Sequence, residues 1–91
     1  MYAVTDLGRR VVWEGRQDPP GATRDAPAFA MWMVAWVGAR APHFTVDDLR
    51  AHADAILTFP DQPEETLAAG QYLKTYTVYT LMKAMEKGWV M

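Results

Sequence analysis

The residues that could carry chemistry are few, and none of them stands in a catalytic arrangement. The chain has no cysteine and no serine, which excludes thiol and serine nucleophiles as well as disulfides. Asp48 and His52 are four residues apart on one face of a predicted helix. A metal site normally needs at least three protein ligands, and no third ligand completes this pair. We therefore expect no catalytic residue, no metal and no cofactor, and a protein that is not an enzyme.

Acidic residues are concentrated between residues 40 and 65. Six acids face two arginines there, a net charge of −4, whereas residues 71–91 carry three lysines and one glutamate, a net charge of +2. These acids stand at helix starts and in loops, where capping and solvation explain them without catalysis. An acidic surface can also imitate the phosphates of nucleic acid and occupy a basic groove of a partner protein. The residues that would form such a surface are Asp47, Asp48, Glu64 and Glu65.

Composition indicates one globular domain over residues 1–91. The chain is 51% hydrophobic and 22% charged, which is ordinary for a folded protein. No apolar run follows a basic start at the N-terminus, so we expect no signal peptide. The longest uncharged stretch, residues 26–39, is too short for a transmembrane helix, which needs about 20 residues. We expect a cytoplasmic protein that does not enter a membrane.

The elements that must position these residues are predicted to be mostly helices. Residues 2–14 read either as two short strands or as a helix that begins after Thr5 and runs to Glu14, and we favour the helix. Residues 15–24 contain Pro-Pro-Gly and read as a loop. The predicted fold is all-α or nearly so, with about four helices in a helix-turn-helix-like arrangement and room for a minor β element at the termini.

The next predicted helix runs from an N-cap at Asp25 to about Arg40, with Pro27 in its first turn. It is apolar all round, which is typical of a helix buried on every side. A chain of 91 residues can barely surround such a helix, so its surplus apolar surface favours a homodimer. The residues expected at that interface are Phe29, Trp32, Met33 and Trp36.

Two amphipathic segments follow in the middle of the chain. Thr45 caps a helix over residues 46–57 that buries a stripe at Val46, Leu49, Ala53, Ile56 and Leu57. A shorter helix covers residues 64–69, and Gly70 ends or weakens it. The last helix runs from Lys74 or Thr75 to Lys87. Its predicted core stripe is Val78, Leu81, Met82 and Met85, and this spacing argues against a strand over residues 72–80.

The last 20 residues carry a pattern that resembles a known family. Thr75 and Thr77 open the segment, Val78, Leu81 and Met85 follow at helical spacing, and Glu86-Lys87-Gly88-Trp89-Val90 leads into an apolar end. Over residues 73–90 this resembles the recognition helix of winged-helix regulators of the MarR type. The resemblance implies a helix-turn-helix protein that binds DNA and controls transcription. The face it would turn to DNA consists of Lys74, Tyr76, Tyr79, Thr80, Lys83 and Lys87.

The net charge of −2 counts against this function, because nucleic-acid-binding proteins are usually basic. The alternative hypothesis is an acidic inhibitor that binds a basic protein partner. Small phage-encoded inhibitors, including anti-CRISPR and anti-restriction proteins, are similar to this chain in size, acidity and lack of cysteine. The two hypotheses therefore rely on residues of opposite charge: DNA binding on the lysines of the last helix, and inhibition on the acids of the middle region.

Overall fold

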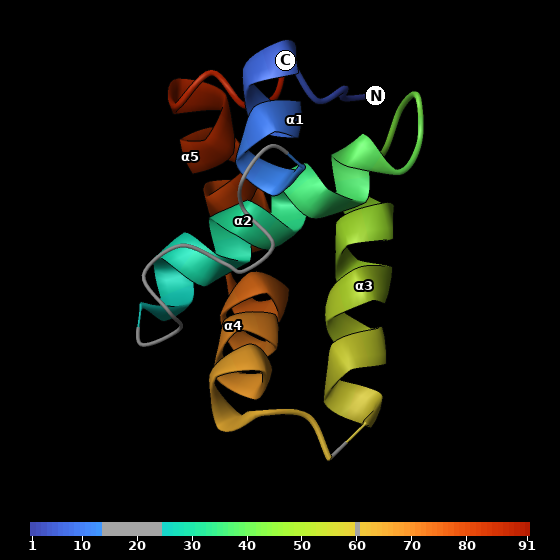
Figure 1. Ribbon diagram of the computed structural model, residues 1–91. Coiled ribbons are helices and arrows are strands. Elements are labelled where there is room, and N and C mark those ends of the chain that lie inside the picture. Colours follow the sequence, from blue (N-terminus) through green and yellow to red (C-terminus); the bar gives the residue numbers. More distant parts are fainter. Residues whose placement is uncertain (14–24, 60) are drawn as a thin grey trace.

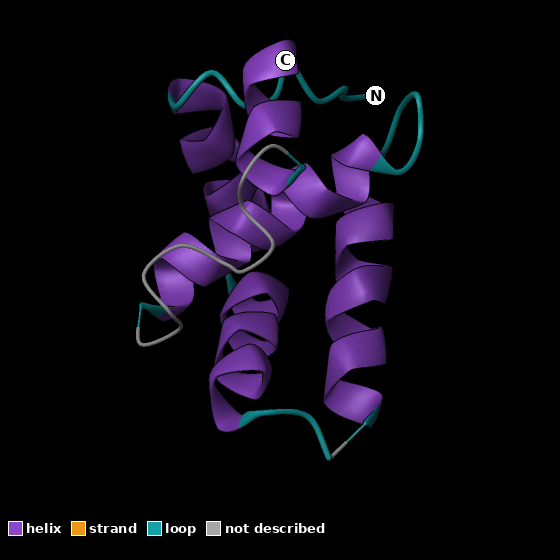
Figure 2. Ribbon diagram, in the orientation of Figure 1, coloured by secondary structure: helices purple, strands orange, loops and turns teal. Residues whose placement is uncertain are grey.

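The computed structural model describes residues 1–13, 25–59 and 61–91, and every regular element within them is a helix (Figures 1 and 2). The five helices are α1 (Asp6–Val12), α2 (Ala26–Ala39), α3 (Val46–Thr58), α4 (Glu64–Thr75) and α5 (Thr77–Glu86). The all-α prediction is confirmed, with five helices instead of about four. The predicted helix end at Glu14 and the predicted loop over residues 15–24 lie outside the described residues.

Helix α2 crosses the middle of the molecule and packs against the other four helices (Figure 1). It begins where the sequence predicts, because the Asp25 carboxylate accepts a hydrogen bond of 3.0 Å from the backbone N–H of Ala28. Phe29, Met33 and Val34 are buried in the main core. The apolar circumference of α2 is thus covered largely within a single chain.

Helices α3 and α4 form an antiparallel pair joined at the bottom of Figure 1. Leu49, Ala53 and Ile56 of α3 are buried, which confirms the centre of the predicted stripe. The predicted end of α4 at Gly70 is wrong, because the helix continues to Thr75. A Cβ atom at Gly70 would lie 2.8 Å from Cγ2 of Ile56, so the glycine lets the two helices approach closely.

The two termini meet at the other end of the molecule. Thr5 caps α1: its hydroxyl accepts a hydrogen bond from the N–H of Gly8 and donates one to the carbonyl of Gly88. Gly88 has φ +79°, the left-handed conformation that ends α5. The helix reading of the N-terminal region is confirmed for residues 6–12. The expected minor β element is reduced to two isolated bridges, Tyr2 with Phe44 and Val4 with Val90.

Helices α4 and α5 are separated by Tyr76 alone, with φ −120° and ψ 47°. Residues 72–80 are helical on both sides of this break, which excludes the alternative strand. The last helix begins at Thr77 and not at Lys74 or Thr75, because Lys74 and Thr75 belong to α4. A helix-turn-helix joins its two helices by a turn of about three or four residues. The predicted helix-turn-helix arrangement is therefore not confirmed.

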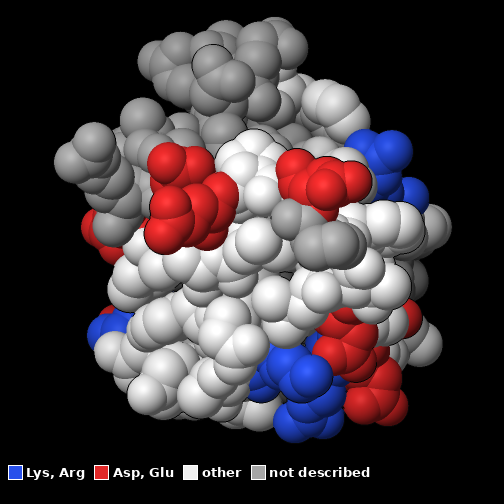
Figure 3. Space-filling model, turned by 90° about the horizontal axis from the view of Figure 1, so that it is seen from below, with Lys and Arg blue, Asp and Glu red and all other residues white. Residues whose placement is uncertain are grey.

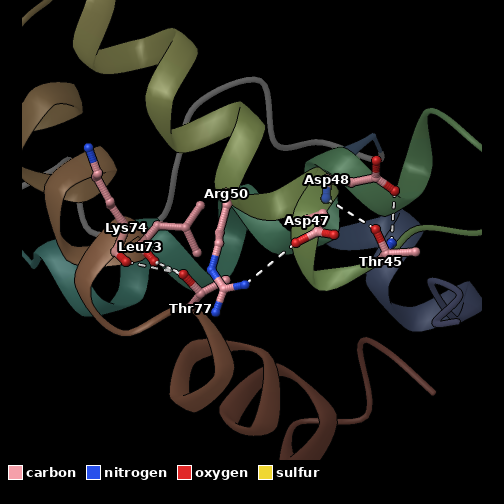
Figure 4. Close-up of polar contacts among 7 residues, drawn as sticks. All are labelled: Thr45, Asp47, Asp48, Arg50, Leu73, Lys74 and Thr77. Atoms are coloured by element: carbon pink, nitrogen blue, oxygen red, sulfur yellow. Dashed lines mark hydrogen bonds and ion pairs between the residues drawn. The ribbon is translucent and has the colours of Figure 1, made fainter.

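The predicted core stripe of the last helix is wrong at three of its four positions. Leu81 is buried as expected, but Val78, Met82 and Met85 are exposed. The buried positions are Thr77, Thr80, Leu81 and Ala84. At about 100° per residue, α5 is rotated by roughly a quarter turn from the predicted orientation. Thr77 can be buried in this orientation without leaving its hydroxyl unpaired, because the hydroxyl donates a hydrogen bond of 2.7 Å to the carbonyl of Leu73 (Figure 4).

Candidate functional site: the outer face of helix α5

The outward side of α5 carries an uncovered apolar row. Val78, Met82 and Met85 are spaced at i, i+4 and i+7, which places them on one side of the helix. Their exposed fractions are 48%, 55% and 41%. We call these three residues the outer stripe. Met82 and Met85 also line a shallow surface hollow of about 300 Å³ together with Glu86. The outer stripe is therefore a surface that another molecule can reach.

A row of tyrosines lies beside the outer stripe. The ring centroids of Tyr72 and Tyr76 are 4.8 Å apart, and those of Tyr76 and Tyr79 are 6.5 Å apart. The ammonium group of Lys83 lies 5.4 Å from the ring centroid of Tyr79. Burial, followed by the nearby Tyr79 and Tyr76, raises the pKa of Tyr72, so its hydroxyl stays protonated and can donate a hydrogen bond. We call Tyr72, Tyr76 and Tyr79 the tyrosine row.

A pocket of about 280 Å³ opens between α2, α4 and α5. It is lined by Pro27, Met31, Tyr72, Tyr79, Thr80 and Lys83. Sequence reasoning missed Pro27, Met31 and Tyr72 as site residues. No local signal could have revealed them, because they come from helices that only the tertiary structure brings together.

The predicted DNA-binding residues are only partly brought together. Tyr76, Tyr79 and Lys83 lie near one another on the exposed side of the α4–α5 junction. Thr80 is a correction, because it is 1% exposed and does not reach the surface. It turns inward with Leu81 and Ala84, so it cannot contact a DNA backbone in this fold.

The three predicted DNA-binding lysines each have a neighbour within the chain. Lys74 forms an ion pair of 3.2 Å with Asp54, and Lys83 one of 3.6 Å with Glu86. The carboxylate of Glu86, and then Tyr79, raise the pKa of Lys83, which therefore stays charged. Lys87 lies 6.0 Å from the ring centroid of Trp89. In the view of Figure 3, basic groups form small clusters, with acidic groups nearby, on a largely uncharged face. Each of the three lysines thus has an acidic or aromatic side chain of the same chain beside it.

The predicted acidic surface is divided between the two ends of the α3–α4 pair. Asp47 and Asp48 lie in the first turn of α3, and Glu64 and Glu65 in the first turn of α4. Since α3 has 13 residues and is about 20 Å long, and α4 runs antiparallel to it, the two acidic pairs are far apart. Asp48 completes a capping box with Thr45, and Asp47 pairs with Arg50 at 3.5 Å (Figure 4). These contacts assign both residues a local role at the start of α3.

The predicted dimer residues on α2 fall into two groups. Phe29 and Met33 are 5% and 2% exposed, so the chain's own core covers them and a second copy could not contact them in this fold. Trp32 and Trp36 are only half-buried.

The ring of Trp36 lies 5.1 Å from that of His52 and 4.1 Å from the guanidinium carbon of Arg40. Burial, and then Arg40, lower the pKa of His52.

The described part of the chain holds neither a candidate metal centre nor a helix suited to crossing a membrane. No group of three or more His, Asp or Glu residues there could hold a metal ion. None of its helices combines the length and the apolar composition that crossing a membrane requires.

No protein-family model matches this chain, and no curated protein or solved structure does either.

Proposed function

We propose that this protein is a protein-binding module whose contact surface is the outer stripe of α5 with the adjoining tyrosine row. The observation that carries the proposal is the quarter-turn rotation of α5 from the orientation that its sequence pattern predicts. The helix turns Thr77, Thr80 and Ala84 inward and leaves two methionines and a valine in water. Apolar surface gains about 25 cal/mol per Å² when it leaves water, so a partner that covers this face would be stabilised by its burial.

The side chains on this surface are of the types that protein interfaces favour. Tyrosine and methionine are enriched in protein interfaces, where lysine and glutamate are depleted. Methionine adapts its shape to different partners because its side chain is unbranched and flexible. Tyr76 and Tyr79 are about half exposed and present a flat apolar body with a polar tip. The surface therefore suits a protein partner better than a polyanion.

The inhibitor hypothesis is compatible with this proposal if the contact surface is the outer stripe and not the acidic residues. A small inhibitor that blocks a nucleic-acid-handling complex would bind through the outer stripe, because its acidic residues do not form one surface. A homodimer would be another form of the same function, in which the partner is a second copy. Light scattering over a range of concentrations distinguishes the two: a mass that stays monomeric as the concentration is raised assigns the outer stripe to a different protein.

DNA binding is the second candidate function, and one observation favours it. Tyr76, Tyr79 and Lys83 lie together on the surface, and base stacking on aromatic rings beside a cation is a common mode of nucleic-acid binding. Each phosphate that a lysine neutralises adds roughly 0.9 to the slope of log affinity against log salt concentration. Titration of the protein with duplex and single-stranded DNA at several salt concentrations tests this directly.

The protein-binding proposal is tested by co-purification of the full chain from the cells that make it, after nuclease treatment. Met82→Glu places a charge on the outer stripe and should abolish capture of the partner. Phe59→Glu is the matched control, because Phe59 is similarly exposed but lies at the end of α3, remote from α5. Capture that survives Met82→Glu, or that is lost equally with Phe59→Glu, would contradict the proposal. Partners that disappear with nuclease would favour DNA binding.

A further inference from the structure

Two of the three residues of the outer stripe are methionines, and methionine supplies all the sulfur of this chain. The sequence contains six methionines and no cysteine. Two-electron oxidants such as hydrogen peroxide react with the sulfur of both residue types, and the reaction depends on exposure to solvent. Because no thiol competes for the oxidant here, the exposed thioethers are the groups with which peroxide reacts.

The methionines differ widely in their exposure. Met33 is 2% exposed and lies in the core, whereas Met82 and Met85 are about half exposed. Met82 and Met85 also line the shallow hollow on α5, which is wide enough for a molecule as small as hydrogen peroxide. Met1 and Met91 are exposed as well, but they lie outside the outer stripe. An oxidant therefore reaches the outer stripe while the core stays protected.

The orientation of α5 allows this oxidation without loss of the fold. A sulfoxide is polar, and burying a polar group without a hydrogen-bond partner is unfavourable. In the orientation that the sequence pattern predicts, sulfoxides at Met82 and Met85 would lie in the core. In the structure both side chains face water, so their sulfoxides would be hydrated in the free protein. The unfavourable effect arises only when a partner covers the outer stripe.

We infer that Met82 and Met85 form a reversible oxidation site that switches off protein binding at the outer stripe. A lone pair of the thioether sulfur attacks one oxygen of hydrogen peroxide, so that an S–O bond forms and the O–O bond breaks. The second oxygen leaves with both protons as water, the sulfur loses two electrons and the peroxide gains them. Methionine sulfoxide reductases reverse the step with a thiol as reductant, and the sulfoxide oxygen leaves as water. This inference rests on the proposed function, because the sulfoxides act only against a bound partner.

The first measurement uses the purified full chain and needs no partner. After brief peroxide treatment, peptide mapping by mass spectrometry should show Met82 and Met85 oxidised at least about tenfold faster than Met33, which the oxidant reaches only when the core opens. The oxidised chain should elute earlier from a phenyl column, because its surface is less apolar, and should keep its melting temperature. Equal oxidation of Met33, unchanged elution, or unfolding of the oxidised chain would overturn the inference.

The second measurement tests whether oxidation prevents binding. The immobilised chain, untreated or oxidised, is incubated with nuclease-treated, gel-filtered lysate of the cells that make it. The readout is the protein whose capture Met82→Glu abolishes. An unpaired polar group in a buried contact weakens binding by about tenfold, so half-maximal capture should need at least about tenfold more oxidised chain. Methionine sulfoxide reductases with a thiol should restore capture. Capture that oxidation leaves unchanged, or that the reductases do not restore, would contradict the inference.

Two double variants assign the effect to residues. Met82→Leu with Met85→Leu removes both thioethers of the outer stripe, so peroxide should change neither its elution from the phenyl column nor its level of capture. Met31→Leu with Met91→Leu is the matched control, because it removes two thioethers outside the outer stripe, and it should respond to peroxide as the unmodified chain does. A peroxide effect on elution that persists in the first variant, or disappears in the second, would overturn the assignment.

The oxidation site and the proposed function fail in different ways. If Met82→Glu abolishes capture but oxidation of Met82 and Met85 does not weaken it, the protein-binding function stands and the oxidation switch is wrong. If capture withstands both Met82→Glu and oxidation, the outer stripe is not the contact surface and both proposals are wrong.

Discussion

Helices α3 and α5 are of similar length, but they differ in which side they bury. Helix α3 buries the apolar side that its sequence pattern predicts, whereas α5 leaves most of its predicted apolar side exposed. In α3, Leu49, Ala53 and Ile56 face the core, and the charged residues face water. In α5, two threonines and an alanine face the core together with Leu81, and the outer stripe faces water. Because apolar residues occur on both sides of α5, its pattern leaves the choice of buried face to its neighbours. The contrast shows that the sequence pattern of α3 alone predicts its buried side, whereas that of α5 does not.

The largest expected effects come from the buried leucines of the two helices. Leu49→Ala in α3 and Leu81→Ala in α5 should each lower the free energy of unfolding by about 2–5 kcal/mol, because both side chains are fully surrounded. Met82→Ala should change it by less than about 0.5 kcal/mol, because that side chain is already in water. Urea denaturation measures all three. A loss at Met82 as large as that at Leu81 would show that α5 is oriented as the sequence pattern predicts.

The next effect concerns how each helix begins. Thr45 of α3 accepts a hydrogen bond of 3.2 Å from the N–H of Asp48 and completes a capping box, whereas α5 has no side-chain cap. Thr45→Ala should therefore lower the free energy of unfolding by about 1 kcal/mol. Tyr76→Ala, at the start of α5, should cost less, since its side chain caps nothing. If thermal unfolding showed equal losses of stability for the two variants, the cap at Thr45 would not contribute measurably to the free energy of unfolding.

The two buried threonines of α5 should respond differently to the same substitution. Thr77→Val removes a hydroxyl that donates to two backbone carbonyls, Leu73 at 2.7 Å and Lys74 at 3.2 Å, and should cost about 1 kcal/mol. Thr80→Val removes a hydroxyl without a partner among the described residues and should leave stability unchanged or raise it. Comparison of the two melting temperatures tests this. A clear loss at Thr80→Val would mean that the hydroxyl is satisfied in the free protein.

The smallest effect concerns the half-buried polar residue of α3. The pKa of His52 lies below its usual value of 6.5 in the folded chain because of burial and Arg40. The unfolded chain binds the proton more readily, so the stabilising contribution is complete above about pH 6.5 and is lost as the pH falls through that value toward the folded pKa. The free energy of unfolding should thus decrease from pH 7.5 to pH 5. His52→Gln should reduce this decrease, and an identical pH dependence in that variant would assign it to other groups.

Sequence reasoning located most helix boundaries and some of the site. The starts of α2 and α3 were predictable because each depends on one side chain and a backbone N–H three residues later, at Asp25 and Thr45. Tyr76, Tyr79 and Lys83 were predicted as exposed binding residues, and all three line the α4–α5 surface, although the partner expected there was DNA. Gly70 was misread because a glycine that ends a helix and a glycine that lets helices approach look alike in sequence.

The sequence by itself determined which segments are helices, since capping and local propensity act within a few residues. Only the tertiary structure decided which side of α5 is buried, because that depends on how small residues such as Thr77 and Ala84 fit against neighbouring helices. It also decided that the acids at residues 47–48 and 64–65 lie far apart, since α3 and α4 run in opposite directions. The pocket depends both on the residue types in the sequence and on the packing of the helices. Its residues belong to α2, α4 and α5, and only packing brings Met31, Tyr72 and Thr80 to one cavity.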